Sequence, residues 1–432
     1  MKYLLIFVLS LFISHSILAQ EIEKIIVQND VERIIKKLSS DEMRGRSAMK
    51  PEDIGKATAF IESEFKAIGL QNLKDLKSFR QEFEKTKIEK ISSEVVIDGE
   101  KILPDNFIFV SNNDETVWNS DVTVKVLEKD KDFFKEFRSL RNGADSKIVL
   151  VAPEYQKQFQ RVQGLYNQTR LLDANTEKMG TTLFVLGRKT ATHFSVTIRQ
   201  KKAPLVMTNV VGMLEGRSKK NEMVIFAGHY DHLGIISPVN GDSIANGADD
   251  DASGTTAVIE LARYFKKLNN NERTLIFVAF TAEEIGGFGS QYFSKQLDAD
   301  KVVAMFNIEM IGKPSKWGEN SAFITGFERS DFGTILQKNL KGTKFEFHPD
   351  PYPEQNLFYR SDNTTLARLG VPAHSISTDQ IDSDKLYHTV KDEFSSLNMS
   401  NVTTTIRFIA LSSVTLVNGK DTPKRIDIPG NK

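Results

Sequence analysis

From residue 204 onward, short apolar segments alternate with amphipathic helical segments, and this alternation limits the folds open to the chain. The apolar segments read "MVIFAG", "TLIFVAF", "VVAMFNI", "SAFITG" and "PAHSIST". Apolar residues three and four apart predict helices over residues 253–267, 289–297, 329–340 and 400–417. Continuous apolar strands flanked by helices predict a three-layer α/β/α fold with a mostly parallel, mixed central sheet. In such a sheet, ligands bind beyond the carboxyl ends of the strands.

The preceding part of the chain divides into a helical region and a region rich in strand patterns. Residues 21–75 show helical periodicity, with Gly69 as the expected stop and "DEMRGR" as a polar turn. Short β-branched runs such as "SEVVIDG" and "KIVLVA" predict a β-rich inserted domain over residues 88–203. The main domain is therefore expected to combine residues 20–87 with residues 204–432.

The first residues, "MKYLLIFVLSLFISHSILAQ", predict a signal peptide over residues 1–19. One lysine precedes an apolar stretch that is too short and too polar at its end for a comfortable transmembrane helix, and Ala19 supplies the small residue before cleavage. Polar residues interrupt the stretch and no basic cluster follows it, which disfavours an uncleaved anchor helix. We expect an exported chain, periplasmic or extracellular, with no stable membrane insertion after cleavage.

Charge and cysteine content narrow the possible ligands. Lys plus Arg and Asp plus Glu both number 57, so no basic surplus favours nucleic acid as a partner. The chain has no cysteine, which excludes disulfides and thiolate metal sites. Any metal must be held by His, Asp and Glu.

The first polar cluster is "GHYDH", directly after "MVIFA". His229 and Asp231 are two residues apart, so in extended backbone they share a face. A carboxylate in that position can fix the ring orientation of a metal-bound imidazole.

The second cluster is "NGADDDASG", where Asp249, Asp250 and Asp251 precede a predicted helix. Three adjacent negative charges without a local Lys or Arg repel one another, and a bound cation would relieve this repulsion. At least one of the three is expected simply to cap the helix.

Three further motifs contain candidate metal-binding or catalytic residues. Glu283 and Glu284 follow a buried strand in "TAEEIGG", so one can bind a metal while its neighbour accepts a proton. Glu309 lies in the apolar segment "MFNIEMIG", where a lone carboxylate is costly unless it is paired or coordinated. "DKLYHT" places Tyr387 beside His388. Lone histidines such as His374 are interpreted as structural or surface residues.

This inventory of nitrogen and oxygen donors suits zinc, with manganese or cobalt as less favoured choices. Two imidazoles and three carboxylates, with one carboxylate left over as a base, are the makeup of a two-metal hydrolytic site.

With these motifs in this order, the chain resembles the di-zinc exopeptidases, a family that includes secreted bacterial aminopeptidases and, more distantly, glutamate carboxypeptidase and the transferrin receptor ectodomain. The match covers roughly residues 30–75 and 204–418, including "DEMRGR". The resemblance implies two Zn²⁺ per chain and peptide substrates.

The resemblance also implies a role for each matching position. His229 would bind one metal, with Asp231 orienting it, and Asp250 would bridge the two metals. Glu284 and His388 would bind the second metal. Glu283 would be the general base, and Tyr387 would help to stabilise the oxyanion. His232 is commonly present in such sequences without being a ligand.

Glu309 departs from the family pattern, which usually has aspartate at this position. Its carboxylate is one methylene further from the backbone, so the metal beside His229 is expected to bind differently or more weakly, with Glu309 still a ligand. In "YRSDNTT", Arg360 matches a loop near the substrate and is assigned to hold a carbonyl or carboxylate oxygen.

These patterns indicate an exported zinc aminopeptidase that removes N-terminal residues from peptides. Two alternatives remain: a glutaminyl cyclase, which shares the fold, and a metal-free binding module like the receptor relative. The insertion resembles protease-associated domains and is interpreted as either a lid or exosite or as inert decoration. The patterns define neither a side-chain preference nor an oligomeric state.

Overall fold

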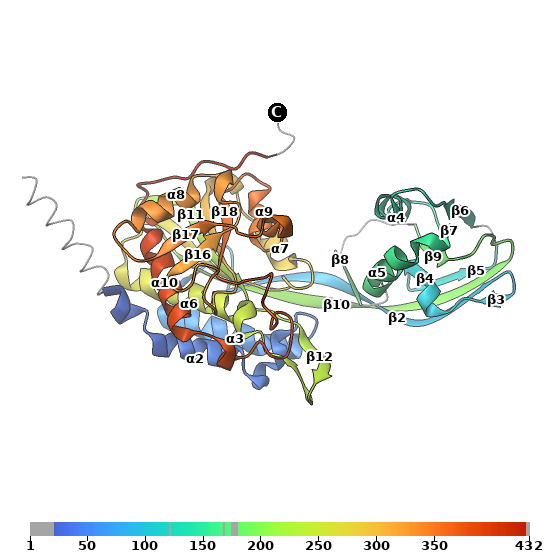
Figure 1. The fold of residues 1–432 in the computed structure, drawn as a ribbon, viewed down its shortest axis with the longest axis horizontal. Coiled ribbons are helices and arrows are strands. Elements are labelled where there is room, and N and C mark those ends of the chain that lie inside the picture. The colour runs from blue at the N-terminus through green and yellow to red at the C-terminus, as the bar shows by residue number, and fades with distance from the viewer. Residues whose placement is uncertain (1–20, 121, 167–168, 174–179, 429–432) are drawn as a thin grey trace, which may run out of the picture. The chain divides into compact units, whose positions relative to one another are not determined.

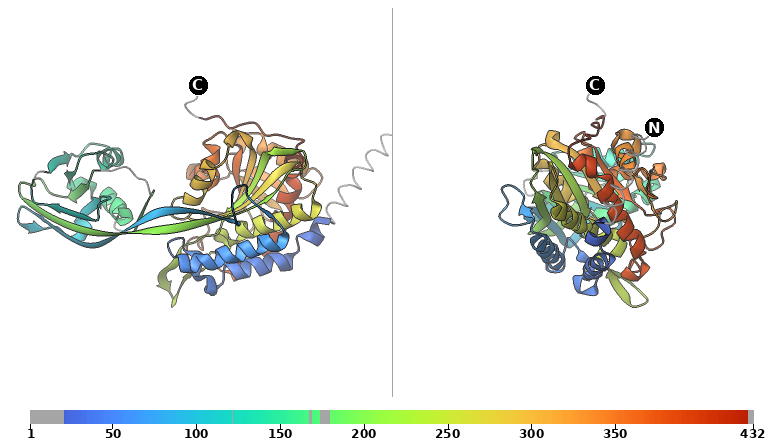
Figure 2. Two further views of the ribbon diagram at one scale, coloured as in Figure 1. Left: turned by 180° about the vertical axis from the view of Figure 1, so that it is seen from behind. Right: turned by 90° about the vertical axis from the view of Figure 1, so that its left-hand side faces the viewer.

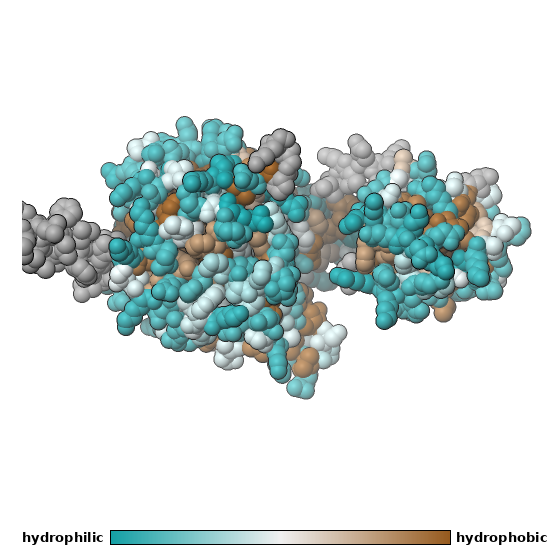
Figure 3. All heavy atoms as spheres, turned by 45° about the horizontal axis from the view of Figure 1, so that its top comes forward, coloured by the Kyte–Doolittle hydropathy of each residue, from teal (hydrophilic) through white to brown (hydrophobic). Residues whose placement is uncertain are grey.

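The computed structural model describes residues 21–120, 122–166, 169–173 and 180–428. The expected signal peptide, residues 1–19, lies outside these ranges. The described chain forms two compact units: residues up to Phe83 together with those from Met207 onward, and Glu84–Val206. Within the described ranges, no helix is both long enough and apolar enough to cross a bilayer. The face of each unit that Figure 3 shows is mostly hydrophilic.

The first unit is built on a mixed sheet with the strand order β17-β16-β18-β15-β11-β14-β10 (Figure 1). The bounds are β10 Phe194–Leu214, β11 Lys219–His229, β14 Arg273–Phe280, β15 Val302–Ile308, β16 Ser321–Ile324, β17 Glu346–Pro349 and β18 Ala373–Ser377. Strands β14, β11, β15 and β18 are parallel neighbours, whereas β10 pairs antiparallel with β14 and β16 pairs antiparallel with β18. The predicted mostly parallel, mixed sheet is confirmed.

Helices cover both faces of this sheet. Alternate side chains of each strand point to opposite faces, and since the strands are apolar throughout, both faces must be buried. On one face, Phe226 of β11 stacks on Phe265 of α6 (Gly254–Leu268). Helices α2 (Gln28–Leu38), α3 (Pro51–Ile68) and α10 (Met399–Ser412) contact α6 on this side (Figure 2). On the other face, Ile225 and Ala227 join a cluster with Phe293 of α7 (Phe288–Lys295) and Leu366 of α9 (Asn363–Ala367). The three layers follow from this two-residue period.

The remaining elements of this unit are helices and turns where the sequence predicts them, but their first and last residues differ from the predicted ones. The "DEMRGR" turn is a short 3₁₀ segment, Asp41–Arg46, and α3 ends at Gly69, whose φ of 79° is the left-handed conformation that favours glycine. Helix α8 spans Phe332–Asn339. The helix expected over residues 400–417 is divided into α10 and α11 (Val414–Val417). A hairpin, β12 (Gly234–Val239) and β13 (Asp242–Ala245), connects β11 to the aspartate-rich segment.

The second unit contains more helix than its sequence predicts. A four-stranded sheet in the order β4-β9-β7-β6 comprises Phe107–Val110, Thr182–Leu186, Lys147–Val151 and Thr123–Leu127. Helices α4 (Phe133–Arg141) and α5 (Gln156–Tyr166) pack on one face through an aromatic cluster that includes Phe137, Phe159 and Phe184. These helices are short, and the sequence did contain a helical signal for α4, because Phe133 and Phe137 are four residues apart and share one face.

Long strands form the rest of the second unit. Strand β2 spans Arg80–Ile97 and pairs with β3 (Glu100–Lys101) and β8 (Arg170–Asp173), while β10 pairs with β5 (Glu115–Trp118). Because β2 and β10 each begin in one unit and end in the other, this unit spans residues 84–206, against the predicted 88–203.

His374 lies in the core of the first unit, as the structural interpretation of this residue requires. The side chain is fully buried in β18, with Nδ1 2.8 Å from the Thr325 carbonyl oxygen and Nε2 2.8 Å from Ser330 Oγ. Burial lowers the pKa of His374 to about 4. The neutral ring is therefore the form that the fold stabilises.

We expect acid to destabilise the fold through His374. The unfolded chain binds a proton at this residue near its ordinary pKa of 6.5, whereas the folded chain does not until about 4, so the free energy of unfolding decreases as the pH falls through that interval. Between pH about 7 and about 4, the wild type should lose roughly 3 kcal/mol more than His374→Asn, which keeps a donor for the Thr325 carbonyl. Urea denaturation at several pH values measures this difference. Parallel pH profiles for the two proteins would contradict it.

Candidate metal centre

The carboxyl ends of four strands bring the expected site residues together. His229 is the last residue of β11, Glu283 and Glu284 follow β14, Glu309 follows β15, and His388 lies in the loop after β18. Asp250 comes from the Ala248–Ser253 segment that leads into α6. Since parallel strands end at the same edge of the sheet, residues up to 159 positions apart meet there (388 minus 229).

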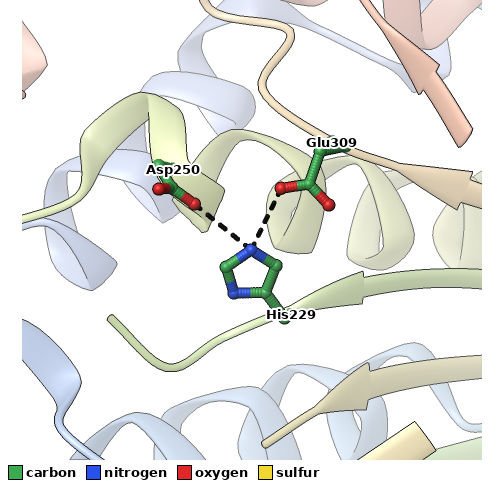
Figure 4. Close-up of side chains that lie close together, drawn as sticks. All are labelled: His229, Asp250 and Glu309. Atoms are coloured by element: carbon green, nitrogen blue, oxygen red, sulfur yellow. Dashed lines mark hydrogen bonds and ion pairs between the residues drawn. The ribbon is translucent and has the colours of Figure 1, made fainter. Parts of the chain in front are cut away.

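A first group consists of His229, Asp250 and Glu309 (Figure 4). His229 Nε2 lies 3.2 Å from Asp250 Oδ1 and 3.2 Å from Glu309 Oε1. The imidazole is buried, and its Nδ1 is 3.1 Å from the Asp231 carbonyl oxygen. With Nδ1 directed at a carbonyl, Nε2 is the nitrogen presented to the two carboxylates.

A second group lies on the other side of Asp250. His388 Nε2 is 3.2 Å from Asp250 Oδ2 and 3.0 Å from Glu284 Oε2. His232 also belongs here, because its Nδ1 lies 2.7 Å from Glu284 Oε1 and 3.7 Å from Asp250 Oδ2. The family resemblance implies no ligand role for His232, although its position three residues after His229 is a signal for this contact. Asp250 therefore directs one oxygen at each group, which is the arrangement of a bridging carboxylate.

The residues present fit a pair of bound cations. Asp250 Oδ2, His388 Nε2 and His232 Nε2 are buried and have no well-formed hydrogen bond. Buried polar atoms without partners are costly, and they gather here around donors that are all nitrogen or carboxylate oxygen. This donor set suits zinc.

The electrostatics of the protein alone are consistent with this fit. Burial lowers the pKa of His229, but the carboxylates of Glu309 and Asp250 outweigh it and raise the pKa well above its ordinary value. Burial and then the negative charge of Glu309 raise the pKa of Glu283 well above its ordinary value, against the effect of His229. The excess of buried negative charge would be neutralised by divalent cations.

Asp231 acts on the turn after β14 more than on the imidazole. Its Oδ1 accepts a hydrogen bond of 3.0 Å from the Glu283 amide, and its Oδ2 accepts one of 3.4 Å from the Glu284 amide. The carboxylate is 3.7 Å from His229 Nδ1, further than the Asp231 carbonyl oxygen. Asp231 thus fixes the backbone that carries the two glutamates, and its carbonyl orients His229.

Glu309 reaches the first group despite being longer than the aspartate of the family pattern. Its Oε2 accepts a 2.6 Å hydrogen bond from Ser361 Oγ, which itself accepts one of 2.8 Å from Asn307 Nδ2. These contacts leave Oε1 directed at His229.

The three consecutive aspartates have different environments. Asp249 Oδ1 accepts the Gly312 amide at 2.7 Å. Asp251 accepts the amides of His229, Gly254 and Met310, at 3.1, 3.0 and 3.1 Å, and so satisfies the first amide of α6, whose N-cap residue is Ser253. Only Asp250 faces both groups.

Arg46, from the "DEMRGR" turn, holds the segment that carries Asp250. The side chain is fully buried, and its Nε donates to the Tyr230 carbonyl at 2.7 Å. Its two terminal nitrogens donate to the carbonyls of Leu38, Asn246 and Gly247 at 2.7, 2.5 and 2.8 Å. No local pattern indicates this role, because the acceptors are backbone atoms up to 204 residues away.

A pocket of about 610 Å³, including its open mouth, adjoins the two groups. Its lining includes Asp250, Glu283, Glu284, Glu309, Tyr387 and Arg360. The Tyr387 ring stacks on His388 at 3.9 Å between centroids, and burial raises the pKa of the phenol far above its ordinary value, so it stays protonated. Arg360 is exposed, with Nη1 3.4 Å from Gln355 Oε1.

Comparison with known proteins agrees with this geometry. Residues 209–412 match the family model described as Peptidase family M28. A probable zinc metalloprotease of Pyrenophora teres f. teres (strain 0-1) is 35% identical over 111 residues, which are 25% of this chain and 23% of the relative. Leucine aminopeptidase 1 of Aspergillus niger is 27% identical over 232 residues, covering 50% of this chain and 57% of the relative. The chain thus spans between about a quarter and somewhat more than half of the length of these relatives.

Two solved structures share the fold. An aminopeptidase from Aneurinibacillus sp. strain AM-1 superposes with a TM-score of 0.57 at 19% identity, covering 96% of this chain and 98% of that one. A zinc aminopeptidase from Bacillus subtilis gives 0.56 at 16% identity, covering 91% and 96%. The three-layer α/β architecture is therefore shared with both, and the family resemblance expected from the motifs is confirmed.

We expect Arg46→Lys to destabilise the protein by at least roughly 3 kcal/mol, because an ammonium cannot replace a guanidinium that bonds four buried carbonyls in different directions. Arg44→Lys is a matched control in the same turn, since Arg44 is half-exposed and pairs with Asp53 at 3.0 Å. This control should cost less than about 1 kcal/mol. Chemical denaturation of both variants measures the difference, and equal effects would exclude the role assigned to Arg46.

Proposed function

We propose that this chain, whose residues 209–412 match the model of peptidase family M28, is a zinc-dependent aminopeptidase with two metal ions per chain. The observation that carries the proposal is the Asp250 carboxylate, which faces His229 with one oxygen and His388 with the other. A single-metal site, as in the alternative of a glutaminyl cyclase, does not need a carboxylate shared between two imidazole-containing groups. A metal-free binding module does not need these buried, unpaired donors at all.

The protein would hold one ion with His229, Asp250 and Glu309, and the other with Asp250, Glu284 and His388. When bound, such ions polarise the scissile carbonyl and lower the pKa of water toward neutrality. His232 lies against Glu284 and fixes the orientation of that carboxylate.

Glu283 is the proposed general base. It lines the pocket beside the metal-facing carboxylates, and its raised pKa suits a group that takes a proton from the attacking water and returns it to the leaving amine. The protonated phenol of Tyr387 donates a hydrogen bond to the oxyanion that develops on the carbonyl. The guanidinium of Arg360, on the exposed side of the pocket, binds a carbonyl oxygen of the peptide.

Export is part of the proposal. It rests on the pattern of residues 1–19. Expressed with its full sequence in a bacterial host, the chain should reach the periplasm or medium with a mass that corresponds to cleavage after Ala19. A full-length chain retained in the cytoplasm would argue against export.

We expect Glu283→Gln to lose activity by a factor on the order of 10² to 10⁴ while it keeps both zinc ions, because the amide cannot accept the proton of water. Hydrolysis of aminoacyl p-nitroanilides measures activity, and elemental analysis measures the metal.

Glu284→Gln is the matched control for this prediction, one residue away in the same turn. Because Glu284 is an assigned ligand, its replacement should reduce zinc content, and a chelator should abolish wild-type activity reversibly. A Glu283→Gln variant with near-normal turnover would remove Glu283 from the role of base. Pyroglutamate formation without release of free amino acids would favour the cyclase.

A further inference from the structure

The pocket at the metal centre continues into a region that the proposed chemistry does not use. Beyond the metal-facing carboxylates, its wall is apolar, formed by Met310, Phe323, Leu357 and Ile381. Further lining comes from Thr325, Ser375, Ser377 and Asp379. An aminopeptidase must place the scissile carbonyl at the metals, so the side chain of the N-terminal residue enters this adjoining space. Its lining therefore determines which side chains are accepted.

Asp379 is the one carboxylate of this lining that is not assigned to the metal centre. It follows β18, is only 4% exposed, and neither of its oxygens meets a hydrogen-bond donor of the protein. A carboxylate that is buried and unpartnered in this way is costly unless a ligand satisfies it.

The neighbours of Asp379 increase this cost. Oxygens of Asp249 and Asp384 lie within 4.8 Å of one of its own. Lys313 Nζ pairs with these two carboxylates, at 3.1 and 2.6 Å, and no such pair forms with Asp379. Burial, followed by the charges of Asp249 and Asp384, raises the pKa of Asp379 to about 8. Lys313 already serves as the cation of the other two aspartates, so Asp379 is protonated near neutral pH until a positively charged group enters the pocket and favours its ionised form.

We propose that Asp379 determines specificity by binding the ammonium or guanidinium of an N-terminal lysine or arginine side chain. The inference rests on the proposed aminopeptidase function and adds its substrate class. The apolar wall contacts the methylene stem of such a side chain, while the buried carboxylate receives its charged end. Arg360, the other charged group of the lining outside the metal centre, is exposed, whereas Asp379 is buried and takes up its negative charge when a cationic side chain binds.

The test compares lysyl and norleucyl p-nitroanilides, which share the four-carbon stem and differ by the ammonium group. The zinc-loaded wild type should show a kcat/KM for lysine about 10- to 100-fold above that for norleucine, the range expected for a charged hydrogen bond. Asp379→Asn should remove this preference while it changes the norleucine value by less than about threefold. Asp379→Glu, which keeps the charge, should retain a preference for lysine. Asp382→Asn, an exposed aspartate three residues later, is the matched control and should behave as wild type.

Several results would overturn the inference. A wild-type enzyme that prefers the norleucyl substrate would exclude the role of Asp379. This result needs no variant, so it remains decisive even if Asp379→Asn fails to fold. An equal loss for both substrates in Asp379→Asn would instead assign Asp379 to the substrate α-ammonium.

A binding measurement distinguishes a failure of the proposed aminopeptidase function from a failure of the role of Asp379. Calorimetry of zinc-loaded Glu283→Gln with lysinamide and norleucinamide reports recognition without turnover. Tighter binding of lysinamide supports the role of Asp379 even where no p-nitroanilide is hydrolysed, and equal binding contradicts it.

Discussion

The site depends on the hydrogen bonds that the buried Arg46 guanidinium donates to backbone carbonyls beside His229 and just before the aspartate-rich segment. Through them the "DEMRGR" turn joins the Tyr230 carbonyl, beside His229, to the Asn246–Gly247 backbone, before Asp250. The Asp392 carboxylate also holds this backbone, because it accepts hydrogen bonds from the Asp249 and Asp250 amides at 2.9 and 3.0 Å. The backbone around Asp250 is thus fixed from both sides, and its side chain can face two groups at once.

The same region contains many buried carboxylates, and these carboxylates have different kinds of partner. Asp231 and Asp251 are satisfied by backbone amides and hold strand ends in place. Asp249 and Asp384 are neutralised by Lys313. Among the described residues, the carboxylates that face the imidazoles form no ion pair with a lysine or arginine, and this donor set of imidazoles and carboxylates fits divalent metals. Asp379 is outside each of these arrangements, and its position in the pocket makes the substrate its natural partner.

Much of the fold follows from local patterns. Strand β14 is buried along its whole length, so its apolar run could be identified as central, and Gly69 ended α3 because glycine accepts the left-handed conformation. Helices α4 and α5 are not among the sequence predictions, because each is short and is stabilised by an aromatic cluster that forms only with β4, β7 and β9. His232 was discounted for a similar reason, since its contact with Glu284 joins residues 52 positions apart.

By itself, the sequence determined the layered α/β class and the candidate ligands, because strand and helix periods are local and buried polar residues stand out against apolar runs. Only the tertiary structure decided which of those residues face the imidazoles and which accept backbone amides or pair with a lysine. Asp249, Asp250 and Asp251 are chemically identical neighbours, and they differ only in what the folded chain places opposite them: Gly312 and Lys313, two imidazoles, or three backbone amides. The energy of a charged group is set by its surroundings, and those surroundings exist only once distant segments have packed together.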